Sequence, residues 1–179
     1  MRHLIVLPGN SPRNRDWGVA CAEYFTPWFD SVWMAEYAHW GSGEKWINLA
    51  QEEERLRNHV INLPADTAVY IFAKSIGSIL AVNAIAHRTV VPAGCAFFGM
   101  PLDYAVPEVW QDDPKPLAAL TAPTVIFHND ADPTASYKIT SDTLTMHVRH
   151  ATFIATHDAT HDYLDFVQYE PKIVQSLPL

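Results

Sequence analysis

The chain has 179 residues, 49% of them hydrophobic and 18% charged, which is the composition of a globular domain and not of a disordered segment. Its formal net charge of -8, without any cluster of Lys and Arg, argues against nucleic acid or an anionic membrane surface as a partner. The first apolar run is too short for a secretory signal and no run approaches the length of a membrane span, so we expect a cytoplasmic protein. Cys21 and Cys95 form no CxxC pair and are expected to be small buried side chains.

Short apolar runs alternate with longer helical patterns from one end of the chain to the other. The runs with the length of strands are His3–Leu7, Val32–Tyr37, Ala68–Ala73, Cys95–Phe98, Thr124–His128 and Val148–Ile154. The segments with helical patterns are Arg15–Phe29, Trp46–Ile61, Ile76–His87, Ala135–Met146 and Asp162–Gln175. This order predicts an α/β fold, a three-layer αβα sandwich with a mostly parallel sheet, in a single domain over residues 1–179.

The segment Met100–Pro123 interrupts this alternation. It carries five prolines together with Asp112 and Asp113, so we expect an excursion between two strands rather than an element of the sheet. Such an excursion can serve as a short lid or binding loop, and an inert surface loop is an equally good interpretation.

The residues that follow the strands carry the chemistry, because ligands of a parallel sheet bind at the carboxyl ends of its strands. After Ala68–Ala73 the chain reads A-K-S-I-G, with Ser75 between a buried strand and an apolar helix. This spacing resembles the G-x-S-x-G nucleophile elbow, with Ala73 in place of the first glycine and Gly77 as the second. Ser75 is therefore the predicted nucleophile, and the alternative is a serine that only caps the helix.

An aspartate-rich turn follows the strand Thr124–His128. The sequence H-N-D-A-D-P resembles the H-G-x-x-D-P turn that carries the acid in many hydrolases, and Asn129 tolerates the left-handed conformation of the missing glycine. On this alignment Asp132 is the acid that orients the base, and Asp130 is the second candidate. A turn rich in Asp and Pro for conformational reasons alone is the alternative.

Two histidines follow the last predicted strand. His161, in the context T-H-D-Y directly before the last helix, is the predicted general base, and His157 is the competing candidate. The run from His157 to His161 also mimics the H-E-x-x-H zinc motif. Asp158 is shorter than the glutamate of that motif, the run falls in a turn and no third ligand is evident, so we expect no metal.

The loop after the first strand reads L-P-G-N-S-P. In the corresponding place hydrolases supply one backbone N–H of the oxyanion hole, and the residue after the nucleophile supplies the other. We therefore expect the backbone amides of Asn10 and Ile76 to hold the oxyanion, with an ordinary Pro-Gly turn as the alternative. The loop is no G-x-G-x-x-G motif and the chain has no Walker motif, so nucleotide binding is disfavoured.

Together these motifs resemble those of a minimal α/β-hydrolase over nearly the whole chain. The resemblance is to small, cap-less serine hydrolases related to RBBP-nine and to small bacterial esterase-like proteins. It implies acyl transfer through Ser75, Asp132 and His161, without a cofactor, on a small ester or thioester. Lys74 before the serine and Ser78 after Gly77 make the elbow atypical.

Two further expectations concern the substrate and the class of function. Trp17, Trp40 and Trp110 fall near predicted loops and are candidates to line an apolar substrate pocket, although each is as readily a packing residue. A hydrolase-like domain that binds a small molecule or a protein without chemistry is the alternative function, because a fold alone does not imply an activity. No oligomeric state follows from the sequence.

Overall fold

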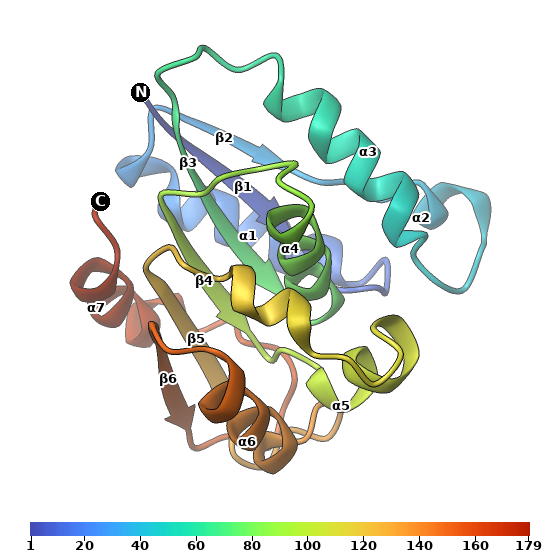
Figure 1. Cartoon of the computed structure of the whole chain (residues 1–179). Coiled ribbons are helices and arrows are strands. Elements are labelled where there is room, and N and C mark those ends of the chain that lie inside the picture. Colours follow the sequence, from blue (N-terminus) through green and yellow to red (C-terminus); the bar gives the residue numbers. More distant parts are fainter.

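A computed structural model describes residues 1–179, and Figure 1 shows a single sheet surrounded by helices. The sheet has six strands in the order β2-β1-β3-β4-β5-β6, and all neighbouring strands run parallel. The strands are β1 (Arg2–Leu7), β2 (Ser31–Met34), β3 (Ala68–Lys74), β4 (Gly94–Phe98), β5 (Thr124–Asn129) and β6 (Ala151–Thr156). The predicted fold class is confirmed, with a sheet that is wholly parallel.

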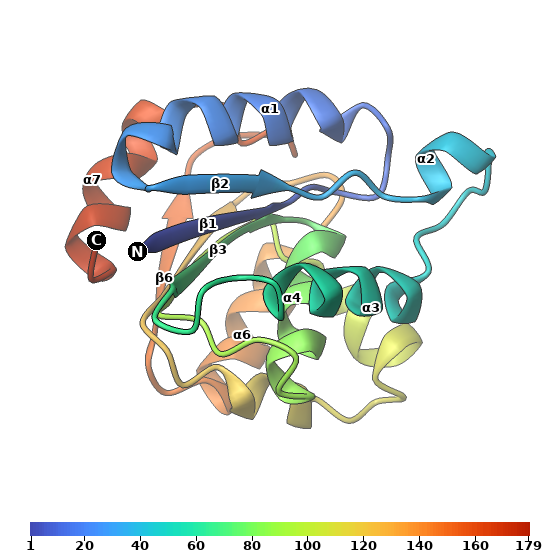
Figure 2. The ribbon, with the colours of Figure 1, turned by 90° about the horizontal axis from the view of Figure 1, so that it is seen from above.

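Helices cover both faces of the sheet (Figure 2). One face carries α1 (Asn14–Phe25) and α7 (Phe166–Ser176), and the other carries α3 (Leu49–Val60), α4 (Ile76–Ala86) and α6 (Tyr137–His147). The shorter helices are α2 (His39–Ser42), α5 (Leu102–Tyr104), a π-helical turn over Ala105–Val109, and 3₁₀ turns over Thr26–Trp28 and Lys115–Ala119. The three-layer sandwich brings the carboxyl ends of all six strands to one edge.

Alternation along each strand supplies two hydrophobic cores. In β3, for example, Ile71 and Ala73 face α4, whereas Tyr70 and Phe72 face α1 and α7. Side chains of successive strand residues point to opposite faces, so a strand covered on both sides must be apolar throughout. This requirement explains the continuous apolar runs that identify the strands in the sequence. Cys21 and Cys95 are free and buried.

Two element boundaries after residue 147 differ from the prediction. Helix α6 continues to His147, so β6 begins at Ala151 and not at position 148. Helix α7 begins at Phe166 and not at position 162, because the side chain of Asp165 caps it by accepting a hydrogen bond from Gln168 N. Residues 157–165 thereby form a loop at the carboxyl edge of the sheet.

The segment 100–123 is built from short helical turns. Leu117 and Leu120 are buried in the core on the α4 side, together with Ala105. The excursion therefore belongs to the layer of α4 and α6 over much of its length. Its first turn, α5, lies next to the carboxyl end of β4 (Figure 1).

A pair of histidines lies between β1 and α3. The Nε2 atoms of His3 and His59 are 2.8 Å apart, and His3 Nδ1 is 2.7 Å from Ser31 Oγ. The ring of His59 stacks on Trp33, with ring centres 4.1 Å apart. Burial, and next the neighbouring His59, lower the pKa of His3 to about 4, and burial also lowers the pKa of His59. Both imidazoles are therefore neutral at pH 7.

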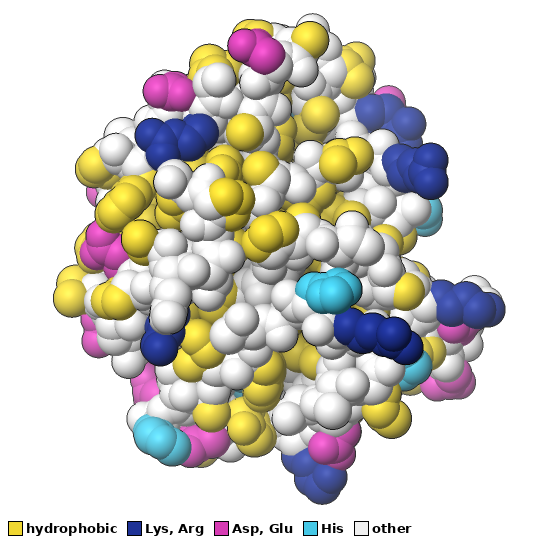
Figure 3. Space-filling view, turned by 60° about the vertical axis from the view of Figure 1, so that its left-hand side comes forward, with side chains coloured by type: hydrophobic (Ala, Val, Ile, Leu, Met, Phe, Trp, Pro, Cys, Tyr) yellow, Lys and Arg dark blue, Asp and Glu magenta, His cyan; other side chains and the backbone are white.

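The surface carries mixed charges. On the face shown in Figure 3, the Lys and Arg side chains are scattered among hydrophobic and acidic ones. No helix has both the length and the apolar character that crossing a membrane requires.

Candidate active site

Ser75 occupies a sharp turn between β3 and α4. Its backbone has φ 53° and ψ -127°, a conformation that L-residues rarely adopt and that surrounding contacts must hold in place. Ser75 N donates to Phe98 O of the neighbouring strand over 2.8 Å. Ser75 O accepts from both the backbone N and the Oγ of Ser78, at 2.9 and 2.6 Å. The strained turn is therefore anchored on both sides, and the atypical Ser78 is one of its anchors.

Gly77 allows α4 to lie directly against β1. A Cβ atom at this position would fall 2.2 Å from Leu7 O and 2.5 Å from Pro8 O, both of them backbone atoms. Ala73, by contrast, is fully buried in the core on the α4 side with its methyl group accommodated. This difference explains why the first glycine of the elbow pattern can be replaced in this chain and the second cannot.

Asp132 lies beyond the end of β5 and its carboxylate is fully buried. Its Oδ1 accepts from the backbone N of Thr134 and Ala135 at 2.8 and 3.1 Å, and its Oδ2 accepts from His161 Nδ1 and Tyr163 Oη, each at 2.7 Å. Burial by itself raises the pKa of Asp132. The hydrogen bonds from His161 and Tyr163 outweigh burial and hold this pKa at about 2. The carboxylate is therefore ionised and fixed in orientation.

His161 lies over the end of β4 with its side chain 15% exposed. Nδ1 donates to Asp132, which leaves Nε2 as the acceptor of a neutral ring; Nε2 is buried and has no hydrogen-bond partner. The ring lies against Gly99, where a Cβ atom would be 2.8 Å from His161 Cε1. Gly99 directly follows Phe98, the residue that anchors Ser75 N, so Ser75 and His161 flank the same end of β4. Their Oγ and Nε2 atoms are not hydrogen-bonded to each other in this structure.

The two competing residues, His157 and Asp130, pair with each other. His157 Nδ1 lies 2.6 Å from Asp130 Oδ2, and their side chains are 89% and 41% exposed. The His157–Asp130 pair is thus a solvent-facing pair, whereas the His161–Asp132 pair is buried. The two histidines of the H-D-A-T-H run bind different aspartates, and no group of three or more His, Cys, Asp or Glu is arranged to hold a metal ion.

Tyr163 is a further residue of the site. Its backbone has φ 53°, and its buried hydroxyl donates to Asp132 and accepts from Asn129 N at 2.9 Å. Its carbonyl accepts from Trp17 Nε1 at 2.9 Å. Burial raises the pKa of the phenol well above its usual value, so it remains a donor. The sequence analysis used this tyrosine only as context for His161, and no spacing rule indicates its contact with Asp132.

Asn10 is held by the segment that follows β2. Its carbonyl accepts from His39 Nε2 and Trp40 Nε1, both at 2.8 Å, while its side chain donates to Lys45 O at 2.9 Å and accepts from Ile47 N at 2.8 Å. Its backbone N–H makes no hydrogen bond to another backbone group. The N–H of Ile76, at the start of α4, has no partner inside the helix. Both amides predicted to hold an oxyanion therefore lie at the carboxyl edge of the sheet, Ile76 directly after Ser75 and Asn10 three residues beyond the end of β1.

The three tryptophans named as pocket candidates are all held by hydrogen bonds from their Nε1 atoms. Trp17 is 2% exposed and bonds Tyr163 O, and Trp110 is 8% exposed and bonds Asn83 Oδ1 at 2.7 Å, so both belong to the interior. Trp40 is partly buried against the core beneath Asn10. Of the two interpretations offered for Trp17 and Trp110, their burial favours packing residues over residues that line a substrate pocket. The aromatic residues exposed near this edge are Trp46 and Tyr104.

Lys74, the residue before Ser75, is 4% exposed and its Nζ donates to Asn14 Oδ1 over 2.6 Å. Burial lowers the pKa of Lys74 to about 8, and the charges of Asp162 and Asp132 oppose that shift. The Asn14 side chain lies under Gly9, where a Cβ atom would be 2.8 Å from Asn14 Nδ2. The lysine therefore links the Ser75 turn, through Asn14, to the loop that carries Asn10.

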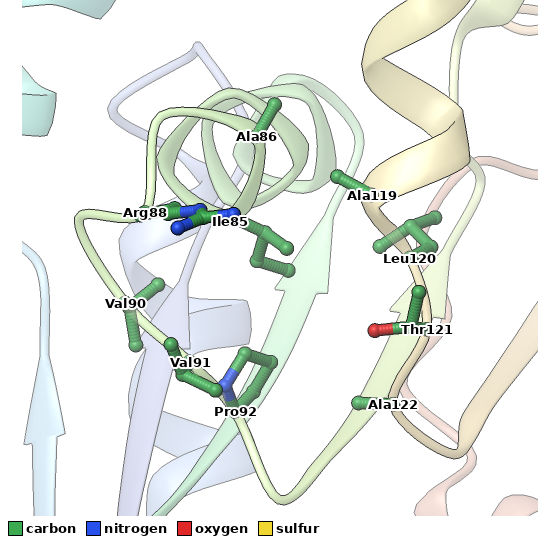
Figure 4. A pocket seen from close by; sticks show the side chains of 10 residues that line it. All are labelled: Ile85, Ala86, Arg88, Val90, Val91, Pro92, Ala119, Leu120, Thr121 and Ala122. Atoms are coloured by element: carbon green, nitrogen blue, oxygen red, sulfur yellow. The ribbon is translucent and has the colours of Figure 1, made fainter.

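A recess of about 460 Å³ lies at the opposite end of α4 (Figure 4). Its lining includes Ile85, Val90, Pro92 and Leu120, with Arg88 beside them. Helix α4 begins directly after Ser75 and rises about 1.5 Å per residue, so its eleven residues separate the recess from Ser75 by roughly 16 Å. This recess is not part of the Ser75 site.

The fold occurs in many known structures, although no protein-family profile and no curated protein matches the sequence. An alpha-beta serine hydrolase homologue from Coxiella burnetii is 14% identical with a TM-score of 0.75, and the match covers 98% of this chain and 84% of that one. Est1E from Butyrivibrio proteoclasticus, solved with ferulic acid bound, is 14% identical with a TM-score of 0.75 over 98% of this chain and 89% of that one. The chain spans 58% of an uncharacterized protein from Bacillus cereus ATCC 10987, which is 16% identical with a TM-score of 0.72 over 97% of this chain. The chain has the α/β-hydrolase fold.

Proposed function

We propose that the protein is a serine hydrolase that cleaves a small ester or thioester through Ser75, His161 and Asp132. The observation that carries the proposal is the buried His161–Asp132 pair at the end of β4, beside a strained serine turn that is anchored to the same strand. A histidine oriented by a carboxylate, with its second nitrogen free, is the arrangement that a general base for a serine requires.

In the proposed reaction His161 Nε2 takes the proton of Ser75 Oγ as Oγ attacks the substrate carbonyl. Asp132 holds the Nδ1–H tautomer and stabilises the imidazolium that forms. His161 then gives the proton to the leaving alcohol or thiol, and the acyl group stays on Ser75. A water molecule, deprotonated by His161, attacks the acyl-enzyme, and His161 returns the proton to Ser75 Oγ as the bond between Oγ and the acyl carbon breaks and the acid is released. His161 Nε2 has no hydrogen-bond partner in the free protein, and contacts between a serine and its base commonly tighten only when substrate is bound.

The oxyanion of both tetrahedral intermediates binds the N–H groups of Asn10 and Ile76. Support comes from the bonds of Asn10, whose carbonyl and side chain are all engaged while its N–H has no backbone acceptor. Loss of one such donor costs about 2.7–4 kcal/mol of transition-state stabilisation. The reaction uses no cofactor.

Labelling with an alkyl fluorophosphonate tests the proposal. We expect covalent labelling of the wild-type protein that is abolished in Ser75→Ala and reduced at least about 100-fold in His161→Ala. His157→Ala is the matched control, since His157 is also paired with an aspartate, and it should label at the wild-type rate. A folded wild-type protein that does not label would contradict the proposal and favour a binding role without chemistry.

A further inference from the structure

Two large aromatic side chains lie exposed beside the Ser75 site. Trp46 is 57% exposed and Tyr104 is 41% exposed, and they are almost parallel, with an angle of 12° between the rings and 6.2 Å between their centres. The ammonium of Lys45 lies 5.3 Å from the centre of the Trp46 ring. The two rings come from distant parts of the chain, so their parallel arrangement is a product of the tertiary fold.

One ring lies on the segment that follows β2 and is bound to the loop after β1, and the other ring lies on the segment that follows β4. Trp46 lies between Lys45 and Ile47, whose backbone O and N atoms are hydrogen-bonded to the side chain of Asn10. Asn10 itself lies three positions beyond the end of β1. Tyr104 ends α5, which follows β4 after a few residues. β3 lies between β1 and β4, so the loops that follow β1 and β4 flank the end of the strand that leads into Ser75, and the Trp46–Tyr104 pair joins the segments attached to these two loops.

The segment that carries Trp46 is held in place by hydrogen bonds that do not involve the Trp46 ring. Four hydrogen bonds tie the segment from His39 to Ile47 to Asn10, and its backbone is therefore ordered without help from the Trp46 ring. The indole of Trp46 makes no hydrogen bond of its own within the protein. Exposed apolar surface on an ordered frame next to a reactive group is characteristic of a ligand-binding surface.

We propose that the Trp46–Tyr104 pair is the specificity element of the site and that the substrate carries a planar aromatic ring close to its ester or thioester carbonyl. The ring of the substrate packs on the faces of Trp46 and Tyr104 while the carbonyl lies between Ser75 and the amides of Asn10 and Ile76. This inference rests on the proposed function and adds the chemical class of the substrate. Aromatic pairs contribute about 0.5–1.5 kcal/mol beyond simple area burial, which corresponds to a rate preference of about 2- to 12-fold.

Two matched pairs of esters test the inference. Methyl phenylacetate and methyl cyclohexylacetate differ in the ring of the acyl part, while benzyl acetate and cyclohexylmethyl acetate differ in the ring of the alcohol part. We expect kcat/KM to favour the aromatic ester at least about 2-fold in one of the two pairs, which identifies the side of the carbonyl that the rings contact. Equal kcat/KM values within both pairs would overturn the inference.

Variants then assign the preference to the pair. Trp46→Ala and Tyr104→Ala should abolish the aromatic preference, while Tyr104→Phe should retain it. Val91→Ala, an exposed hydrophobic position in the recess at the far end of α4, is the control and should leave the preference unchanged. The rate of labelling by a short alkyl fluorophosphonate should be unaffected in Val91→Ala. An aromatic preference that persists in Trp46→Ala and in Tyr104→Ala would overturn the inference while leaving the hydrolase proposal intact.

Binding to Ser75→Ala provides a readout that needs no turnover. In an NMR titration, the indole Nε1–H signal of Trp46, assigned by its loss in Trp46→Phe, should shift on addition of the preferred aromatic ester and not of its cyclohexyl analogue. If the wild-type protein does not label with fluorophosphonate, this titration still decides whether the pair binds aromatic rings. An unchanged Trp46 signal at saturating ester would overturn the inference.

Discussion

Tyr163 Oη lies 2.7 Å from Asp132 Oδ2 and donates a hydrogen bond to it. Asp132 Oδ2 also accepts a hydrogen bond from His161 Nδ1, so two donors together fix the orientation of the carboxylate. Tyr163 is itself held by Asn129 N and Trp17 Nε1. The orientation of the proposed base therefore depends on a buried tyrosine that does not touch the substrate carbonyl, and we regard Tyr163 as a positioning residue.

Tyr163→Phe removes this donor and leaves Asn129 N without its acceptor. A hydrogen bond to a charged group contributes about 1.5–3 kcal/mol, so we expect kcat to fall about 10-fold or more with little change in KM. The pKa of Asp132 should rise from about 2 toward its ordinary value, because one of the hydrogen bonds that lower it is lost. Steady-state ester kinetics at pH 8 would measure kcat and KM separately. An unchanged kcat would exclude the positioning role.

Gly77→Ala tests the close approach of α4 to β1. The new methyl group would lie 2.2 Å from Leu7 O, a backbone atom that cannot move without disrupting the sheet, so we expect a loss of several kcal/mol in the free energy of unfolding. Gly41→Ala is the matched control, because nothing lies within 4 Å of its added Cβ and its backbone is helical. Urea unfolding of the two variants should differ by at least about 2 kcal/mol. Equal urea midpoints for Gly77→Ala and Gly41→Ala would show that α4 can shift away from β1 without loss of stability.

The His3–His59 pair predicts a loss of stability in mild acid. Burial, then the charge of His59, lower the folded-state pKa of His3 from 6.5 to about 4, so the unfolded chain binds the proton more tightly. The stability due to the neutral ring is complete above pH 6.5 and is lost as the pH falls toward 4, with a total on the order of 3 kcal/mol. Urea unfolding at pH 7.5 and at pH 4.5 should show this decrease, and His3→Gln should reduce it, because the buried imidazole that must be protonated is then absent. A decrease of the same size in His3→Gln would assign the acid sensitivity to other groups.

Asn10→Ala separates the side-chain tether from the backbone amide. It removes the bonds to Lys45 O and Ile47 N but keeps the N–H proposed to bind the oxyanion. We expect the aromatic preference to fall and kcat to decrease about 10-fold, since the loop becomes free to move while the donor is still present. Steady-state kinetics on the preferred ester pair would measure both quantities. Wild-type kinetics in this variant would show that the tether does not order the site.

Local sequence patterns were sufficient for the sheet and for the serine turn. The strand leading into Ser75 is buried on both faces and is therefore apolar without interruption, and Gly77 is dictated by one backbone contact. Both features are visible in a short window of sequence.

Other parts of the site depend on contacts between distant residues. The choice between Asp130 and Asp132 is one example: both follow β5 within a few positions, and only the folded loops show that the first pairs with an exposed histidine and the second with a buried one. The tryptophans are another example. Trp17 and Trp46 both lie near the start of a predicted helix, but Trp17 packs against Phe98 and Phe166 and is buried, whereas Trp46 stays exposed.

The order in which the chain supplies its site has a consequence for biosynthesis. Ser75 follows β3 in the middle of the sheet, whereas His161 follows β6, the last strand and an edge strand that pairs only with β5. On the proposed mechanism, a ribosome releases the nucleophile long before the base, so an unfinished chain would hold an inert serine. Fraying of the β6 edge in the finished protein would inactivate the serine in the same way. Covalent labelling of Ser75 would then report completion of the whole sheet and could serve as an assay for correctly matured molecules.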